Sequence, residues 1–502
     1  MDTKALRQKI LDLATRGKLV PQDPNDEPAS VLLERIRAEK QQMVKDGKLK
    51  PKDIKNDTII FVGEDNLHYE KFQDGTVKCI EDEIPFEVPE GWCWCRLGSI
   101  SAAIQYGLSN SAKQSGTHRL LRITDIQDGK VDWDTVPFTT VYEAENYLLS
   151  SGDIVFARTG ATVGKSFLIK ELPYPAVYAS YLIRIRLLDG VLPDYIYQFF
   201  SSQCYWEQIT DKSVGVGQPN CNGTSLKELF IPIPPFSEQN RIVPSALSAL
   251  EYVINIELDK ASLLETVTSI KFKILDLAIQ GKLVPQNQND EPASVLLERI
   301  RAEKEELIKA GKIKRDKKES VIFKGDDNSY YEKIGENIVD ISEEIPFDIP
   351  ENWSFARLED VLVYEQPTPY IVSSTDYKND YQTPVLTAGK SFIIGYTNET
   401  FGIKTELPVI IFDDFTTDSK YVDFPFKVKS SAMKILTAKE KLINTKFAYY
   451  AMQVVECDNY NHKRYWISEF SKKLIPLPPK KEQVEIVNAI EELYKYIEQI
   501  LS

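Results

Sequence analysis

The chain has 502 residues, of which 42% are hydrophobic and 27% charged, a composition typical of globular domains and enough for three or four of them. It contains no run of about 18 apolar residues, and its first residues lack an apolar signal core, so we expect neither a membrane span nor a secretory leader. The net charge of -14 excludes a uniformly basic surface, although a nucleic-acid binder needs only local basic patches.

Three pairs of matching segments show that part of the chain is duplicated. They are KILDLATRGKLVPQ (9–22) with KILDLAIQGKLVPQ (273–286), each followed by an identical DEPASVLLERIRAEK (26–40 and 290–304); EIPFEVPEGW (83–92) with EIPFDIPENW (344–353); and IPIPPFSEQNRIV (231–243) with IPLPPKKEQVEIV (475–487). The segments between the last two pairs are not obviously alike. A duplicated frame is therefore predicted to present two different inserts.

The order of the copies indicates a circular duplication. The N-terminal segment copies the end of the central repeat, and the C-terminal tail copies its start. Joined tail to head, residues 480–502 followed by 1–18 make a second version of residues 236–282. We therefore predict that the chain is opened inside one of its two repeats, which is tolerable because domain termini often lie close together.

Residues 237–281 are predicted to form one long helix. Proline falls only near its first turns, and apolar residues recur at three- and four-residue steps until Gly281 offers a stop. At 1.5 Å per residue this helix is about 65–70 Å long. Both termini carry matching apolar stripes, so we expect the central helix to pair antiparallel with a composite of the two termini. Two unrelated surface helices are the alternative.

The identical segments 26–40 and 290–304 are predicted to form shorter helices. Asp26 or Asp290 is the expected cap, with a proline in the first turn, and Gly47 or Gly311 is the expected end. Packing alone would tolerate more drift between the copies. The identity therefore suggests two equal docking sites for a partner.

The inserts alternate short β-like runs with turns and helical stretches. Residues 92–230 include LLRITDI, GDIVFAR and VYASYLIRIRL, and residues 353–474 include TPVLTAG, FIIGYT and LPVIIFDD. Both inserts are predicted to be compact α+β domains of roughly 120–140 residues.

No motif in the chain predicts catalysis. Residues 160–166, GATVGKS, are one residue short of a phosphate-binding loop, whose backbone N–H groups surround the phosphate. Residues 233–236, IPPF, lack the Asn or Asp that amino-methyltransferases place before Pro-Pro, and Asp413 with Asp414 is more typical of a turn than of acid–base catalysis. The cysteines are irregularly spaced, which predicts reduced thiols in a cytosol and no metal site.

Side chains suited to nucleic acid gather in the inserts instead. Arg and Lys pair with guanine edges, Asn and Gln with adenine edges, and Ser and Thr with phosphates. For any one residue, an ordinary surface polar group is the alternative. The predicted DNA-binding residues are Arg119, Arg122, Arg158, Thr159, Thr162, Lys165, Tyr178, Ser180, Gln218, Asn220, Lys390, Tyr396, Thr416, Ser419, Lys420, Tyr421, Lys463, Arg464 and Tyr465.

The inserts and their flanks resemble the specificity (S) subunits of type I restriction–modification systems. The stretches that carry this resemblance are DIVFARTGATVGKSFLI (153–169), YASYLIRIR (178–186), QPN (218–220), LKELFIPIPPFSEQNRIV (226–243), TPVLTAGKSFIIGYTNET (383–400) and IIFDDFTTDSKYVDFPFKVKSSAMKIL (410–436). The resemblance covers nearly the whole chain, and the motifs are specific in combination.

The resemblance implies an α+β fold in which two target-recognition domains are separated by two long antiparallel helices, a coiled coil, in a pseudo-two-fold circular arrangement. It implies double-stranded DNA as a partner, together with two modification (M) subunits that hold S-adenosylmethionine and methylate adenine N6. Restriction (R) subunits would add cleavage that depends on ATP and Mg. This chain would itself be non-catalytic, bind no cofactor, and lie in the cytoplasm of a prokaryote.

The predicted organisation follows from the repeats and the resemblance together. The regions are 1–50 (N-terminal helical region, which completes the second spacer and docks an M subunit), 51–91 (connector), 92–235 (target-recognition domain 1), 236–318 (central helical region), 319–352 (connector), 353–479 (target-recognition domain 2) and 480–502 (C-terminal helix). The expected DNA site is bipartite and asymmetric, with unspecified base pairs between two specific blocks. The alternatives are a stand-alone DNA-binding or scaffold protein and, more weakly, an enzyme that uses residues 160–165.

Overall fold

The chain divides into a first unit, Met1–Ala261, and a second unit, Ser262–Ser502. The computed structural model describes residues 2–127, 129–212, 220–312, 320–389, 391–439, 443–457 and 464–501. Helix α7 (Phe236–Ile279) contains the boundary between the units, and it confirms the long helix predicted over residues 237–281. None of the helices in the described ranges is long and apolar enough to cross a membrane.

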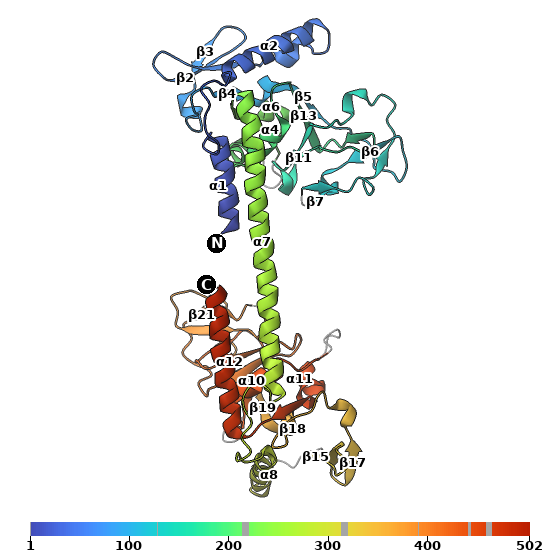
Figure 1. The fold of residues 1–502 in the computed structure, drawn as a ribbon, viewed down its shortest axis with the longest axis vertical. Helices are drawn as coiled ribbons and strands as arrows, with labels where there is room; N and C mark the ends of the chain where they lie inside the picture. The colour runs from blue at the N-terminus through green and yellow to red at the C-terminus, as the bar shows by residue number, and fades with distance from the viewer. Residues whose placement is uncertain are drawn as a thin grey trace. The chain divides into compact units, whose positions relative to one another are not determined.

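The first unit combines short helices with several small sheets (Figure 1). Its helices besides its part of α7 are α1 (Thr3–Thr15), α2 (Ala29–Lys45), α3 (Pro51–Ile54), α4 (Pro193–Phe199), α5 (Gln203–Lys212) and α6 (Gly223–Lys227). Its strands are β1 (Ile59–Val62), β2 (His68–Lys71), β3 (Val77–Cys79), β4 (Cys93–Arg96), β5 (Ser101–Tyr106), β6 (His118–Leu121), β7 (Ile126–Gln127), β8 (Lys130–Val131), β9 (Phe138–Thr139), β10 (Ile154–Ala157), β11 (Ser166–Leu168), β12 (Ala176–Tyr178), β13 (Leu182–Leu187) and β14 (Phe230–Ile233).

The insert of the first unit is built on two sheets. A four-stranded antiparallel sheet has the order β11-β10-β13-β5, and a three-stranded sheet has the order β12-β6-β9, with β12 parallel to β6. Strand β10 is an apolar run, whereas β13 alternates apolar residues with Arg184 and Arg186; apolar side chains of both strands join those of α4 in one core cluster. At the base of the insert, β4 and β14 pair antiparallel, so the insert enters and leaves the frame at neighbouring points.

The second unit has the same kinds of element. Its helices after α7 are α8 (Ala293–Lys309), α9 (Leu358–Val361), α10 (Thr445–Met452), α11 (Tyr465–Ser468) and α12 (Lys480–Leu501). Its strands are β15 (Ser320–Lys324), β16 (Tyr330–Ile334), β17 (Asn337–Asp340), β18 (Ser354–Arg357), β19 (Leu362–Glu365), β20 (Thr383–Leu386), β21 (Ile393–Thr397), β22 (Val409–Asp413), β23 (Ser419–Val422), β24 (Lys427–Val428), β25 (Met433–Ala438) and β26 (Leu474–Leu477).

The two inserts share one strand order, although their sequences are not obviously alike. The second insert has a four-stranded sheet of order β23-β22-β25-β19 and a three-stranded sheet of order β24-β20-β21, with β24 parallel to β20. Strands β18 and β26 close its base. Taken in chain order, β5, β6, β9, β10, β11, β12 and β13 correspond to β19, β20, β21, β22, β23, β24 and β25. Each insert is therefore an α+β domain of the same topology.

In the first unit, α1 lies antiparallel beside α7 (Figure 1). Arg7 of α1 pairs with Glu257 at 2.8 Å, and farther along the chain Gln22 donates to Glu238 at 2.7 Å. The other carboxylate oxygen of Glu238 accepts the indole N–H of Trp92 at 2.8 Å. Burial raises the pKa of Glu238, and the two donors oppose that rise. One buried carboxylate thus joins the N-terminal segment, the start of the insert and α7.

In the second unit, α12 lies antiparallel beside α7, and a buried glutamate makes the same set of hydrogen bonds as Glu238. The hydroxyl of Tyr494 donates to the carbonyl of Lys271 at 3.3 Å, and Gln286 donates to Glu482 at 2.5 Å. Glu482 also accepts the indole N–H of Trp353 at 2.9 Å. The antiparallel pairing predicted for the two termini is confirmed within each unit.

The helix α2 begins later than the predicted cap. Its N-terminal cap is Pro28, which makes no side-chain cap bond, and Asp26 instead pairs with Arg241 of α7 at 2.6 Å. The cap prediction was therefore wrong, because α7 supplies a stronger partner for this carboxylate. Helix α8 begins in the same way after Pro292.

The regions predicted as connectors contain a further repeat. Strands β1-β2-β3 and β15-β16-β17 form matching three-stranded antiparallel sheets. Arg96 binds both carboxylate oxygens of Glu70 at 2.9 and 2.6 Å, and Arg357 binds Glu332 in the same way at 3.1 and 2.6 Å. These two ion pairs attach each small sheet to the strand at the base of its insert.

Candidate nucleic-acid interface

The β10–β11 loop carries four of the predicted residues on one turn. They are Arg158, Thr159, Thr162 and Lys165. The loop turns through the 3-10 segment Gly160–Thr162, and the positive φ angles of Gly160 and Gly164, 72° and 89°, suit glycine. The Thr162 hydroxyl donates to the carbonyl of Thr159 at 3.2 Å, and Lys165 is exposed. The loop therefore presents a lysine at the surface.

Arg158 stands at the start of this loop over an aromatic ring. Its guanidinium lies 4.8 Å from the ring centroid of Tyr106, at the end of β5. The hydroxyl of Tyr106 accepts the N–H of Gly223 at 2.8 Å, which fixes the ring. Tyr106 was not among the predicted residues, because nothing in the sequence links it to Arg158.

Two other predicted arginines bind their own domain. Arg119 donates to the carbonyl of Val136 at 2.6 Å and lies over Phe138. Arg122 binds both oxygens of Asp125 at 3.1 and 2.6 Å, and this bond raises the pKa of the guanidinium. These contacts with their own domain set the positions of both side chains.

The remaining predicted residues of the first insert are divided between core and surface. Tyr178 is 0% exposed in β12, and burial raises its pKa to about 12. It is therefore a core residue and not the DNA contact that the sequence predicted. Ser180 is partly buried. Asn220 is exposed, and its backbone forms an isolated antiparallel β-bridge with Thr159 of the loop. Gln218 lies outside the described residues.

The β22–β23 loop is the counterpart in the second insert. The carboxylate of Asp413 accepts the N–H groups of Phe415 and Thr416 at 2.9 and 3.1 Å, as expected for a turn. Asp414 is 1% exposed; it lies 3.2 Å from Lys434 and accepts the N–H of Trp466 at 2.9 Å. The adjacent acids therefore form a hydrogen-bonded turn, as the sequence predicted.

The other predicted residues of the second insert differ in exposure. Thr416 and Arg464 are exposed, and Tyr396, Lys420 and Tyr421 are partly buried. Ser419 and Tyr465 are buried, Ser419 accepting a hydrogen bond from Gln453 at 2.7 Å, so both are corrected from surface contacts to interior residues. Lys390 and Lys463 lie outside the described residues.

The two loops thus occupy the same place in one strand order. Arg158 follows β10 as Asp414 follows β22, and the backbone carbonyl of each accepts an N–H from the far end of its insert, that of Cys221 and that of Tyr465, both at 3.0 Å. Eight of the predicted DNA-binding residues fall on these corresponding hairpins: Arg158, Thr159, Thr162, Lys165, Thr416, Ser419, Lys420 and Tyr421.

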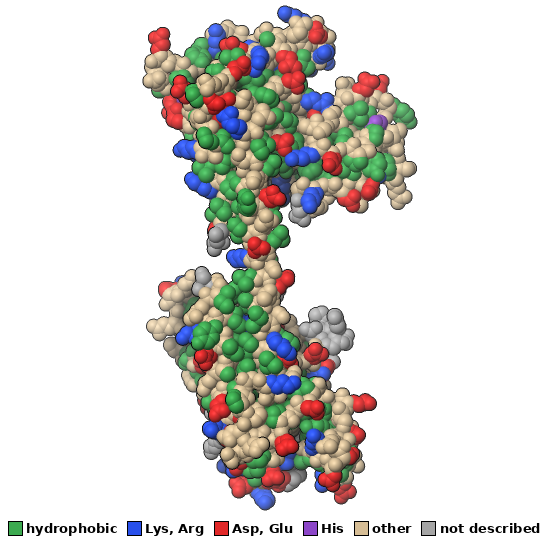
Figure 2. Space-filling model, viewed as in Figure 1, with side chains coloured by type: hydrophobic (Ala, Val, Ile, Leu, Met, Phe, Trp, Pro, Cys, Tyr) green, Lys and Arg blue, Asp and Glu red, His purple; other side chains and the backbone are tan. Residues whose placement is uncertain are grey.

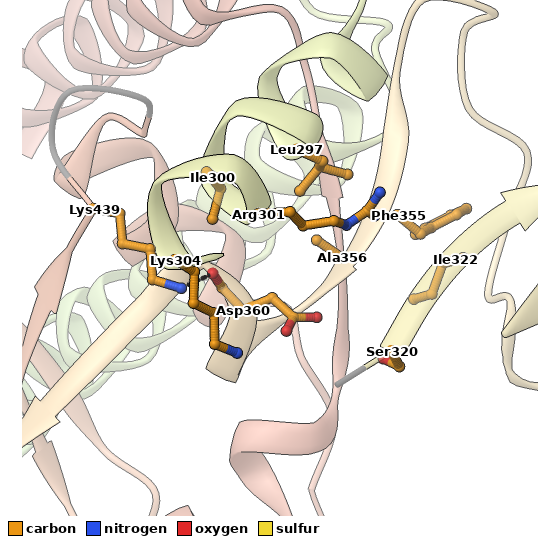
Figure 3. A pocket seen from close by; sticks show the side chains of 10 residues that line it. All are labelled: Leu297, Ile300, Arg301, Lys304, Ser320, Ile322, Phe355, Ala356, Asp360 and Lys439. Atoms are coloured by element: carbon orange, nitrogen blue, oxygen red, sulfur yellow. Dashed lines mark hydrogen bonds between the residues drawn. The ribbon is translucent and has the colours of Figure 1, made fainter. Parts of the chain in front are cut away.

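A second candidate surface is the outer face of the repeated helices α2 and α8. Beneath each helix the packing differs between copies: Leu297 of α8 faces Phe355 where the first unit has Trp94, and Lys439 donates to the carbonyl of Asp360 (Figure 3). Burial raises the pKa of Asp360, and Lys439 opposes that rise. The spaces left there are about 20 Å³ in the second unit and about 290 Å³ in the first.

The solvent-facing residues of these helices do not differ between copies over residues 29–40 and 293–304; beyond them the exposed Gln42 of α2 is replaced by Glu306 in α8. The exposed residues of α2 include Ser30, Glu34, Arg35, Ala38 and Glu39, and those of α8 include Ser294, Glu298, Arg299, Ala302 and Glu303. Exposed positions are the ones that packing constrains least. The identity of these exposed residues is the observation behind the prediction that the two helices dock equal partners.

Large apolar side chains are exposed along the frame helices. In the first unit they include Leu247, Tyr252 and Leu258 of α7, and in the second unit Leu264 and Phe272 of α7. Figure 2 shows hydrophobic side chains gathered along α12 as well, where Tyr496 and Ile500 are exposed. Clusters of this kind commonly mark protein contacts.

The described residues contain one group with metal-ligand chemistry. His68, Glu81 and Glu87 bring potential ligand atoms within 4.8 Å of one another. The His68 ring nitrogen and Glu81 already lie 2.7 Å apart as a hydrogen-bonded pair. The cysteines offer no alternative, since all six are described and none forms a disulfide or joins this group.

Known proteins resemble this chain in sequence. The specificity subunit of the Escherichia coli type I restriction enzyme EcoR124I/EcoR124II is 52% identical over 126 residues, which are 24% of this chain and 31% of that protein. The specificity subunit of E. coli EcoAI is 30% identical over 404 residues, 71% of this chain and 62% of that protein. This chain therefore spans less than two thirds of the length of either relative. The crystal structure of the HsdS subunit from Thermoanaerobacter tengcongensis superposes with a TM-score of 0.42 and 15% identity, covering 83% of this chain and 92% of that one.

A family model gives the assignment. The model described as "Type I restriction modification DNA specificity domain" matches residues 89–268 and 350–501, which are the two inserts with their adjoining frame helices. The match extends over more than half of the chain. The chain therefore belongs to the family of type I restriction–modification DNA specificity domains.

Proposed function

We propose that this chain is the DNA-recognition subunit of a type I restriction–modification complex, and that each insert reads one half of a bipartite, asymmetric site. The observation that carries the proposal is the pair of inserts, which share one strand order and hold loops of different chemistry at the same place. A duplicated frame with unlike loops suits a target whose halves differ in sequence. The relatives named above are specificity subunits of type I restriction enzymes, which supports the same reading.

The partners in this proposal follow from the frame. Two equal outer faces, on α2 and α8, suit two copies of a modification subunit, and the exposed apolar residues of α7 and α12 suit further coverage by helices of a partner. The modification subunits would hold S-adenosylmethionine and methylate adenine N6. Restriction subunits would supply cleavage dependent on ATP and Mg. The chain itself would position these enzymes on DNA, in the cytoplasm of a prokaryote, without binding a cofactor or catalysing a step.

Mapping of methylated adenines in cells that express this chain with its modification subunit tests the proposal. The expected site has two short specific blocks separated by a fixed number of unspecified base pairs, with block centres near one helical turn apart, about 34 Å. A single continuous motif would contradict reading by two inserts. The mass of the purified complex should correspond to two modification subunits for each copy of this chain.

Exchange of one insert sharpens the test. Replacing residues 92–230 by the corresponding insert of a relative should change one block of the site and leave the other unchanged. Replacing residues 353–474 is the matched experiment and should change only the other block. A change in both blocks after either exchange would show that the inserts do not read independently.

A further inference from the structure

Arg158 is held differently from the other arginines of the first insert. Each of those arginines donates to an oxygen of its own unit from its terminal nitrogens, namely Arg96 to Glu70, Arg119 to Val136, Arg122 to Asp125, Arg184 to Leu148 and Arg186 to Asp153. In the described part of the chain, the guanidinium of Arg158 has no hydrogen-bond or ion-pair partner, and its Nε is buried without one. A partly buried guanidinium in this state retains its donors for a ligand.

The surroundings of Arg158 fix its position. Its backbone N–H donates to the carbonyl of Tyr181 at 3.1 Å, and its carbonyl accepts the N–H of Cys221 at 3.0 Å. The side chain lies over the ring of Tyr106, which is itself anchored through its hydroxyl to the backbone of Gly223. A guanidinium stacked on a ring keeps its N–H groups in one plane, where they can meet two acceptors side by side.

The neighbouring groups favour a base edge over a phosphate as the ligand. Three of the loop amides are not open to a phosphate, because the N–H groups of Val163, Gly164 and Lys165 donate to carbonyls within the same hairpin. Besides Lys165, the exposed side chains nearby include two of the kind that contacts bases, a Tyr181 ring that is 62% exposed and the Asn220 amide. Two adjacent acceptors on a base edge occur as O6 and N7 of guanine.

Among the residues that the structure describes, the corresponding place in the second insert offers no such donor. Asp414 stands where Arg158 stands, and its carboxylate is occupied by Lys434 and by the N–H of Trp466. Lys434 is 0% exposed and also donates to Gln366 at 3.2 Å. The arrangement around Arg158 is therefore a property of the first insert and not of the shared fold.

We propose that Arg158, held over Tyr106, reads a guanine through O6 and N7 in the half-site of the first insert. Tyr106 is then a positioning residue, which acts by orienting the guanidinium. This inference rests on the proposed function, because it names the base that one recognition domain contacts.

The test uses the full chain in complex with its modification subunit and a library of DNA duplexes in which each position of the mapped site is varied. The unaltered complex should prefer guanine at one position of the block that insert exchange assigns to the first insert, on the order of 10- to 100-fold over the other bases. Arg158→Ala should remove the preference at that position alone. Arg158→Lys retains the charge without the planar pair of donors, so it should restore overall affinity and not the preference.

Matched variants keep the result interpretable if Arg158→Ala folds poorly. Tyr106→Leu should reduce the guanine preference, and Tyr106→Phe, which keeps the ring, should retain most of it. Lys130→Ala removes an exposed charge elsewhere on the same insert and should leave every base preference unchanged. The melting temperature of each variant separates loss of recognition from loss of folding.

Two outcomes would overturn the inference. One is an unchanged base preference in both Arg158→Ala and Tyr106→Leu. The other is a loss of affinity that is equal for all sequences and is restored by Arg158→Lys, which would identify a phosphate contact. A complex that methylates without any sequence preference would instead overturn the proposed function, and this inference with it.

Discussion

The hairpins β10–β11 and β22–β23 occupy the same place in the two inserts but are held in opposite ways. In the first, Arg158 lies over an aromatic ring, and no described residue accepts a hydrogen bond from its guanidinium; in the second, Asp414 is buried in a network with Lys434. The strands beneath them keep the same apolar character, with Phe156 and Phe412 at corresponding positions and both fully buried. The difference teaches that the buried residues preserve the strand order, while the loops above it are able to change their chemistry.

Loss of the buried hydrogen bonds to Glu238 and Glu482 should give the largest effect on stability, and the effect should be equal in the two units. Trp92→Ala and Trp353→Ala each remove a buried ring and leave a buried glutamate without one of its donors. We expect each variant to lower the free energy of unfolding of its own unit by about 3–5 kcal/mol. Hydrogen exchange across a urea series measures this for each unit separately. Effects that differ several-fold between the units would contradict an equivalent frame.

The ion pairs that attach the small sheets should give an intermediate effect that depends on pH. Arg357 chiefly lowers the pKa of Glu332; for Glu70, burial works in the opposite direction, but the bonds from Arg96 and Thr58 outweigh it. Because the folded pKa values are lowered, the stabilisation is complete above the usual glutamate pKa of about 4.3 and is lost as the pH falls below it.

Glu70→Gln and Glu332→Gln test this pairing. Each variant should lose roughly 1.5–3 kcal/mol of unfolding free energy near neutral pH and less in acid, because the carboxylate that responds to pH is gone. Unfolding curves measured between pH 7 and pH 3 check the prediction. A variant whose stability deficit grows as the pH falls would show that the sign of the pKa shift is wrong.

The outer faces of α2 and α8 should give the smallest effect on stability. Glu34→Lys and Glu298→Lys change exposed residues, so each should alter the unfolding free energy by no more than about 0.5 kcal/mol. If the faces dock identical partners, each variant should reduce the number of bound modification subunits from two to one, as measured by native mass spectrometry. Glu143→Lys, an exposed charge reversal on the first insert, is the control and should leave that number unchanged. Retention of both partners in the two helix variants would remove these faces from the docking surface.

Much of the frame could be predicted because its residues repeat. The circular order of the copies predicted helix α7 and the antiparallel positions of α1 and α12. The small sheets were missed, although their signal is present as GEDNLHYEK at 63–71 and GDDNSYYEK at 325–333. These segments are identical at six of nine positions, but the stretch is short and the strands on either side of it have drifted, so the repeat is weak in the sequence.

The inserts were less predictable, for a different physical reason. Their common topology depends on burial and strand pairing, which many apolar sequences satisfy equally well. Residue type suggested Tyr178, Ser419 and Tyr465 as surface contacts, but exposure depends on which face of a strand or short helix each side chain occupies. That face is fixed by how the three-stranded and four-stranded sheets pack together, and this packing cannot be predicted from the residue types alone.

The hydrogen bonds of Glu238 and Glu482 also determine when each unit can fold during synthesis. Every segment that meets at Glu238 lies within residues 1–261, so the first unit has all of its parts while the second is still being synthesised. At about 5–20 residues per second, that interval is roughly 10 to 50 s. The second unit, by contrast, waits for α12 to provide Glu482 after its insert has emerged. Two equivalent structures therefore face unequal risks during biosynthesis, and a newly made second insert depends longer on whatever protects its exposed strands.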